Sequence, residues 1–211
     1  MKTYLFDFDG TLIDSMPTFV SAVLKILDDN GIAYGDDFVK IITPLGNVNT
    51  AKYIINMGLN MTVEEIISLI RKYVLDAYLY EIPAKNNVIP TLRKLKDEGA
   101  RLNVLTASSH MTLDPCLKRL GIFDLFDNVW SCDDFGTTKT NPEIYRLVSE
   151  KLGVEIGKIF FVDDNYNADK AAKEAGMTVC GIYDNSSKDC IDEIKSVTDY
   201  YIYDFSELLK I

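Results

Sequence analysis

Two aspartates near the amino terminus have a type and spacing that suit metal-assisted chemistry. Asp7 and Asp9 lie two residues apart at the end of the strand-like run Thr3–Phe8, and Gly10 indicates that the chain turns directly afterwards. Two carboxylates held this close together need a cation, and Mg²⁺ prefers oxygen ligands. The pair therefore indicates a magnesium site, and the alternative is a strand that ends in a solvated acidic loop.

Three later segments carry polar residues where an apolar run stops. Thr106 ends the run Arg101–Thr106, and its hydroxyl together with exposed backbone N–H groups, such as that of Ala107, can hold phosphate oxygens. Lys139 would neutralise nearby carboxylates and an incoming phosphate as a point charge. Asp163 and Asp164 follow another apolar run. Ser108 and His110 are possible secondary contacts, although a surface or helix-capping role is favoured for His110.

Short apolar runs alternate with helical periodicities along most of the chain. This alternation predicts an α/β fold, with a doubly wound parallel sheet built through right-handed crossovers. In such sheets the carboxyl ends of the strands form the usual ligand crevice. The predicted strands are Thr3–Phe8, Arg101–Thr106, Asn128–Cys132, Lys158–Asp163, Thr178–Ile182 and Tyr200–Tyr203. The predicted helices are Ile89–Glu98, Thr112–Leu120, Pro142–Leu152, Ala168–Ala175 and Asp189–Ile194.

One long stretch lacks strand patterns and shows only helical periodicity. Val20, Val23, Leu24 and Leu27 form one apolar stripe, and Ile66, Ile67, Ile70 and Val74 form a second. We therefore expect an α/β core domain made of residues 1–14 and 84–211, with an inserted all-helical domain at 15–83. Within the insert, the polar segment 43–50 is expected to be either a loop that contacts the substrate or a helix–helix turn.

Composition excludes several classes of protein. The net charge is −10 and the calculated pI is 4.6, so nucleic acid and anionic membrane surfaces are poor partners. A single histidine rules out a multi-histidine zinc site, and the four cysteines contain no Cys-x-x-Cys pair. Reduced cysteines, the absence of an apolar signal-peptide core and the lack of a long apolar run favour a soluble cytoplasmic protein.

The run Leu5–Ser15, which reads LFDFDGTLIDS, resembles the first signature of the haloacid dehalogenase-like superfamily, in its phosphoglycolate phosphatase and β-phosphoglucomutase-like branch. The resemblance implies a Rossmann-like core in which Asp7 is the nucleophile that forms an aspartyl-phosphate. It implies that Asp9 is the general acid and base. The dehalogenases proper lack this second aspartate, so Asp9 favours phosphoryl transfer.

The remaining family motifs follow in order, with some departures. Thr106 and Lys139 fill the positions of the family's phosphate-binding hydroxyl and lysine, although Thr140 stands where a proline is usual. Asp164 is the expected metal ligand of the fourth motif. Asp163 replaces the usual glycine and is expected to be a first- or second-shell partner of the metal. Asp169, one residue beyond the later acidic position, could complete the shell or merely cap the helix.

The resemblance implies a Mg²⁺ ion held by the Asp7 and Asp164 carboxylates and the Asp9 backbone carbonyl, beneath a mobile helical cap. A cap of this kind favours a small phosphorylated metabolite as substrate. The leading interpretation is a phosphatase that acts on a small phosphate monoester. A β-phosphoglucomutase-like phosphomutase is the first alternative, and a non-catalytic regulatory domain of the same fold is the second.

Overall fold

The computed structural model describes residues 2–43 and 45–211. The chain divides into two compact units, one formed by residues 1–15 and 82–211 and the other by residues 16–81. The first unit contains every strand of the described residues, and the second is helical. None of the described helices is both long and apolar enough to cross a membrane.

The first unit is built on one parallel sheet, which within the described residues has six strands in the order β3-β2-β1-β4-β5-β6. The bounds of β2 and β5 match the predicted strands, and the other four strands are shorter by one or two residues. This confirms the predicted α/β fold class. The strands are β1 Thr3–Phe6, β2 Arg101–Thr106, β3 Asn128–Ser131, β4 Ile159–Asp163, β5 Thr178–Ile182 and β6 Tyr200–Ile202.

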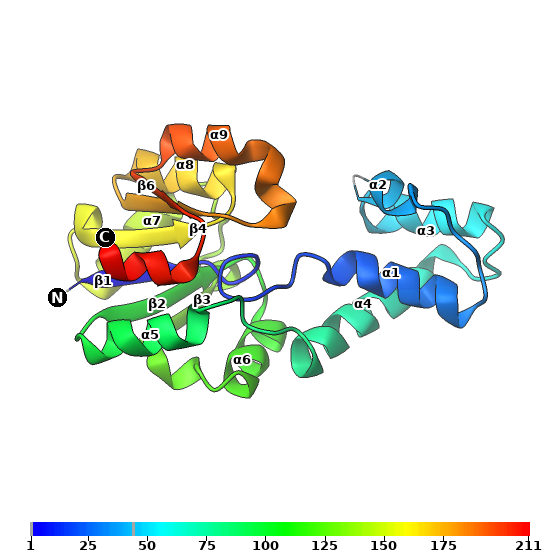
Figure 1. Ribbon diagram of the computed structural model, residues 1–211, viewed down its shortest axis with the longest axis horizontal. Helices are drawn as coiled ribbons and strands as arrows, with labels where there is room; N and C mark the ends of the chain where they lie inside the picture. Colours follow the sequence, from blue (N-terminus) through cyan, green and yellow to red (C-terminus); the bar gives the residue numbers. More distant parts are fainter. Residues whose placement is uncertain (1, 44) are drawn as a thin grey trace. The chain divides into compact units, whose positions relative to one another are not determined.

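Helices cover both faces of this sheet. The helices α5 and α6 lie on one face, and α7, α8 and α9 lie on the other (Figure 1). The chain reverses its direction of travel across the sheet between β1 and β4, which pair side by side. Ligands of open α/β sheets bind at such a switch point, outside the carboxyl ends of the strands. The helices are α5 Val88–Asp97, α6 His110–Arg119, α7 Glu143–Leu152, α8 Tyr166–Ala175 and α9 Ile191–Val197.

The central strands are apolar because both of their faces are buried. All four residues of β1 are buried, and Phe161 and Val162 of β4 are fully buried. The hydrophobic cluster on the face of α7 and α8 includes Leu5, Tyr145 and Phe161. This packing holds the carboxyl ends of β1 and β4 in fixed register, because Asp7 N donates to Val162 O at 2.9 Å.

Short 3₁₀ segments account for some of the departures from the predicted elements. The predicted helix Asp189–Ile194 begins instead as a 3₁₀ turn and continues as α9. The 3₁₀ segments are η1 Phe123–Leu125, η2 Cys132–Phe135, η3 Ile156–Lys158, η4 Asn185–Cys190 and η5 Phe205–Lys210.

The second unit contains α1 Thr18–Asp29, α2 Phe38–Ile42, α3 Gly46–Asn56 and α4 Val63–Tyr80. Its own core is built from Val23, Ile26, Leu27, Phe38, Ile42, Ala51, Ile54, Leu59, Ile66 and Ile70. The interpretation of segment 43–50 as a polar loop is wrong from residue 46 onward, because α3 begins there; Pro44 lies outside the described residues. Thr50, a polar residue that the sequence pattern assigns to the loop, is instead a fully buried residue of α3.

Candidate functional site

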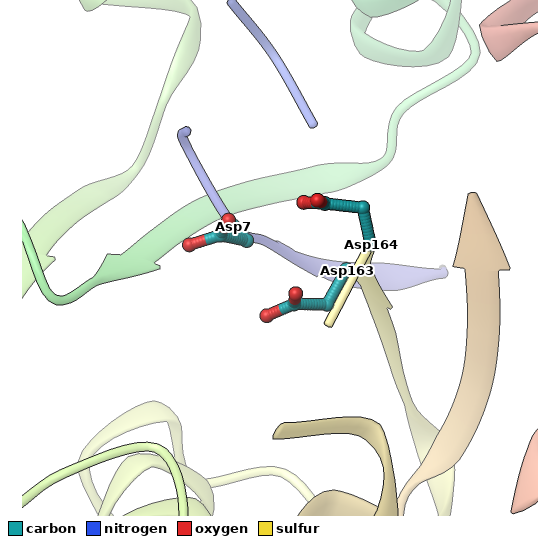
Figure 2. Close-up of side chains that lie close together, drawn as sticks. All are labelled: Asp7, Asp163 and Asp164. Carbon is teal, nitrogen blue, oxygen red and sulfur yellow. The ribbon is translucent and has the colours of Figure 1, made fainter. Parts of the chain in front are cut away.

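Three carboxylates meet at the carboxyl ends of β1 and β4. Asp7 follows β1, Asp163 ends β4, and Asp164 comes next, and all three residues are buried. One carboxylate oxygen from each lies within 4.8 Å of the others. The three side chains point to the same side (Figure 2). Strand pairing, with Phe6 opposite Val162, brings together residues that lie far apart in the sequence.

Lys139 is the cation that faces this cluster. Its Nζ lies 2.5 Å from Asp7 Oδ1 and 2.6 Å from Asp163 Oδ2. Burial alone would lower the pKa of Lys139, but the Asp163 and Asp7 carboxylates raise it well above its usual value. The lysine therefore remains charged, and the structure brings it to the position that the sequence motif predicted.

Electrostatics in the cluster favour a bound divalent cation. Burial and the charge of Asp163 raise the pKa of Asp7 well above its usual value, and the same two causes raise that of Asp164 to about 7. Three carboxylates and one ammonium leave two negative charges to be balanced when all are ionised. Closely spaced oxygen donors with this charge fit Mg²⁺, which binds through few carboxylates plus water and phosphate.

The carboxylate of Asp9 is held on both sides by hydroxyl groups. Ser15 Oγ donates to Asp9 Oδ1 at 2.6 Å, and Ser108 Oγ donates to Asp9 Oδ2 at 2.5 Å. The sequence pattern predicts Ser108 only as a secondary contact and does not point to Ser15. Both serines follow strand ends, but nothing in their sequence spacing shows that they meet the same carboxylate.

The turn after Asp9 requires a glycine. Gly10 has a φ of +78°, and a Cβ at this position would lie 2.6 Å from Asp164 Oδ2. Thr11 Oγ1 donates to Asp164 Oδ1 at 3.1 Å, so the turn also orients that carboxylate. The glycine thus lets the loop after β1 pack directly against the acidic end of β4.

Thr106 and Ala107 lie at the carboxyl end of β2, the neighbour of β1 in the sheet. Thr106 is buried, and its Oγ1 accepts a hydrogen bond from Ser108 N at 3.1 Å. Its hydroxyl proton therefore remains able to donate. Ala107 is exposed on the following loop. This placement suits both residues to holding an oxyanion, which is the role predicted for them.

Tyr145 is a positioning residue that sequence reasoning missed. Its hydroxyl lies 2.9 Å from Lys139 O and 3.0 Å from Ala168 O, so Tyr145 connects the loop that carries Lys139 to α8. The helical periodicity of α7 places Tyr145 among apolar core positions. No sequence signal separates such a tyrosine from an ordinary core aromatic residue.

His110 begins α6 and bridges two carboxylates outside the acidic cluster. Its Nδ1 lies 2.7 Å from Asp114 Oδ1, and its Nε2 lies 2.9 Å from Asp134 Oδ2. These hydrogen bonds raise the pKa of His110. The favoured interpretation of His110 as a surface residue agrees with its exposed position.

Asp169 does not belong to the acidic cluster formed by Asp7, Asp163 and Asp164 in the described residues. Asn165 caps α8 through its side chain, and the helix then directs Asp169 into the interior. Asp169 is fully buried, and neither of its carboxylate oxygens has a hydrogen-bond partner in the structure. Burial, followed by the charge of Asp163, raises the pKa of Asp169 well above its usual value.

Replacing Asp169 by asparagine should stabilise the protein increasingly as the pH rises. A carboxyl group whose pKa is higher in the folded than in the unfolded protein stabilises the fold at low pH, and this stabilisation is lost as the pH rises toward the folded value. The gain in unfolding free energy for Asp169→Asn should therefore be small near pH 4 and at least about 1 kcal/mol near pH 8. Urea unfolding of the wild type and of Asp169→Asn between pH 4 and pH 8 measures this gain. A difference in unfolding free energy that does not change with pH would contradict the prediction.

Comparison with known proteins identifies a family model, relatives and a solved structure that are similar to this chain. A family model described as haloacid dehalogenase-like hydrolase matches residues 4–182. The chain is 32% identical over 181 residues to the pyrophosphatase PpaX of Bacillus velezensis, covering 84% of the chain and 81% of that protein. It is 28% identical to the phosphoglycolate phosphatase of Escherichia coli K12, covering 84% and 79%. The crystal structure of a candidate beta-phosphoglucomutase from Thermotoga maritima aligns with a TM-score of 0.86 at 22% identity, covering 100% and 97%.

Proposed function

This chain belongs to the haloacid dehalogenase-like hydrolase family, and we propose that this phosphatase hydrolyses a small phosphate monoester through an aspartyl-phosphate on Asp7, with Mg²⁺ as its cofactor. The observation that carries the proposal is the buried cluster of Asp7, Asp163 and Asp164, with Lys139 bonded to two of its members. A carboxylate nucleophile next to cations is the arrangement that displacement at phosphorus needs.

Two displacements at phosphorus complete the proposed reaction. In the first, a carboxylate oxygen of Asp7 bonds to phosphorus as the bond to the leaving oxygen breaks, and that oxygen takes a proton from Asp9. In the second, water attacks the phosphorus of the aspartyl-phosphate and gives a proton to Asp9. Inorganic phosphate then leaves, and the Asp7 carboxylate is restored. Asp9 thus acts first as general acid and then as general base.

The cations have a distinct part in this proposal. Mg²⁺ bound by Asp7, Asp164 and the Asp9 backbone carbonyl would offset the negative charge of the phosphoryl group. Lys139 lies against Asp7 and would bind the same phosphoryl oxygens, together with the Thr106 hydroxyl and the Ala107 backbone N–H. Asp163 would serve mainly to fix Lys139, because Asp163 Oδ2 bonds to the lysine and Asp163 Oδ1 accepts from Asn165 N at 2.8 Å.

Small anionic phosphates are the proposed substrates. The curated relatives are named for pyrophosphate and phosphoglycolate, so both compounds belong in a substrate panel. The helical unit of residues 16–81 would act as a cap that admits a small metabolite and excludes macromolecules. The net charge of −10 agrees with a small-molecule partner and disfavours nucleic acid. We propose a cytoplasmic location for the enzyme, in keeping with the free, buried cysteines Cys116, Cys132 and Cys180.

Phosphate release from a panel of small phosphate esters tests the proposal. We expect release with Mg²⁺ and little release after EDTA treatment, with activity restored when Mg²⁺ is added back. Release that is unaffected by EDTA would contradict the metal assignment. If no ester of the panel is hydrolysed, the phosphatase proposal fails. Isomerisation of sugar phosphates would then support the phosphomutase alternative, and inactivity in both assays would support the regulatory one.

A further inference from the structure

A second ammonium group, that of Lys85, is partly buried and lies outside the acidic cluster. Lys85 Nζ donates to Gly10 O at 2.5 Å, to Tyr183 O at 2.9 Å and to Asp184 Oδ2 at 2.8 Å. An ammonium group has three N–H donors, so all of them are used. The side chains of Lys85 and Asp184 are 19% and 6% exposed. A lysine in such a setting is neither a solvated surface residue nor available to bind an anion.

Lys85 joins three separate segments of the first unit. Its backbone N donates to Leu12 O at 3.0 Å, so backbone and side chain both hold the loop after β1. Asp14 N donates to Pro83 O at 3.1 Å, and Ile13 forms an antiparallel bridge with Ala84. The third segment begins where β5 ends, at Tyr183 and Asp184.

The loop that Lys85 holds contains the groups proposed to do the chemistry. Gly10 directly follows Asp9, and its unusual backbone conformation packs it against the carboxylate of Asp164. The carbonyl that Lys85 binds belongs to the peptide between Gly10 and Thr11, and Thr11 in turn bonds to Asp164. Fixing this peptide therefore fixes the backbone on one side of Asp9 and the orientation of Asp164 on the other.

Loss of the ammonium would remove a hydrogen bond from each of three groups. The carbonyls of Gly10 and Tyr183 would each lose a charged donor, and the Asp184 carboxylate would keep only its bonds to Ser186. Burial alone would raise the pKa of Asp184, and the hydrogen bonds from Lys85 and Ser186 lower it below its usual value. The loop after β1 would relax to restore hydrogen bonding, and small displacements of a catalytic group can cost large factors in rate.

We propose that Lys85 is a positioning residue for proton transfer, which holds the Gly10 peptide so that Asp9 meets the leaving oxygen. The inference rests on the proposed function, because it concerns the step in which the phosphorus–oxygen bond breaks and the leaving oxygen takes its proton from Asp9. Lys85 touches neither the substrate nor the reacting atoms in this assignment. It acts through the backbone of Gly10.

Two esters whose leaving groups differ in their need for a proton can distinguish a role of Lys85 in proton transfer from a role in stabilising the fold. An alkoxide must be protonated as it leaves, whereas p-nitrophenolate leaves without a proton. The ratio kcat/KM covers the steps up to departure of the leaving group, so later hydrolysis of the aspartyl-phosphate does not enter it. A variant that only lowers the amount of folded enzyme reduces kcat/KM for both esters by the same factor.

The experiment compares Lys85→Met with the wild-type enzyme, both saturated with Mg²⁺. The substrates are p-nitrophenyl phosphate and the alkyl phosphate that the wild type hydrolyses fastest. For Lys85→Met we expect kcat/KM to fall at least about tenfold for the alkyl ester and less than about threefold for p-nitrophenyl phosphate. Equal falls for the two esters, or no fall for either, would overturn the proposal.

Two matched variants test the assignment to the Gly10 contact. Lys96→Met removes a lysine that pairs with Asp127 at 2.9 Å at the surface of the same unit, and it should leave the ratio between the esters unchanged. Asp184→Asn keeps an acceptor for Lys85 and the bond to Gly10, so its ratio should also stay near that of the wild type. If Asp184→Asn changes the ratio of kcat/KM between the two esters as much as Lys85→Met does, the assignment to the Gly10 contact is overturned.

Different results would contradict the proposed function and the role of Lys85. A wild-type enzyme that hydrolyses neither ester contradicts the proposed function itself. An active wild type with equal losses in Lys85→Met contradicts only the role of Lys85. If Lys85→Met does not fold, as judged by circular dichroism, Lys85→Arg replaces it under the same criterion. A planar guanidinium cannot reproduce three bonds from one nitrogen, so the same selective loss is expected.

Discussion

Asp7→Asn should lower the turnover of every phosphate ester by roughly 10³-fold or more, because the proposed reaction passes through an aspartyl-phosphate on Asp7. Asp7 Oδ1 lies 2.5 Å from Lys139 Nζ and within the acidic cluster, so the amide replacement removes the proposed nucleophile while changing the side-chain volume little. Initial rates of phosphate release with and without Mg²⁺ measure the effect. An acid-quenched reaction should also show no phosphate bound to the variant protein.

Asp14→Asn is the matched control for this experiment. Asp14 lies in the same loop but is exposed, and its backbone contact with Pro83 does not involve the side chain. Its activity should stay near that of the wild type. Near-wild-type turnover by an Asp7→Asn preparation of verified intact mass would contradict the nucleophile assignment, since deamidation back to aspartate would then be excluded.

The sheet was predictable because its strands are buried on both faces. The run Ile159–Val162 is continuously apolar and is bounded by Lys158 and Asp163, and this pattern indicates the limits of the strand even without tertiary information. The strand ends then place Asp7, Thr106 and Asp164 at one edge of the sheet. That part of the candidate site follows from strand order alone.

The supporting contacts were not predictable because they depend on tertiary register. Lys85 and Gly10 are 75 residues apart, and Lys85 reads in the sequence as an ordinary loop lysine. Ser108 reaches Asp9 only because β1 and β2 are neighbours in the sheet, whereas Ser15 reaches it through the fold of their common loop. The burial of Asp169 depends on where α8 begins. The helix begins at Tyr166, two residues before the predicted start, and periodicity cannot resolve such a difference.

Asp9→Asn should produce a second, mechanistically distinct loss. For alkyl esters we expect a fall in turnover of roughly 10²- to 10⁴-fold, because the leaving oxygen loses its proposed proton donor. With p-nitrophenyl phosphate the first displacement needs no proton, but the attack of water on the aspartyl-phosphate still needs a base. A burst of p-nitrophenolate, equal in amount to the enzyme and followed by slow turnover, should therefore appear in stopped-flow absorbance.

The burst distinguishes the proposed role of Asp9 from a role in folding or metal binding. A variant that fails to bind Mg²⁺ should lose the burst together with the turnover, as Asp7→Asn should. Asparagine can accept from only one of the two serine hydroxyls that hold Asp9, so some local rearrangement is expected. Ser108→Ala controls for that loss, because it removes one of these contacts while keeping the carboxyl group. If Ser108→Ala shows the same burst and the same slow turnover, the carboxyl group of Asp9 is not the base that activates water.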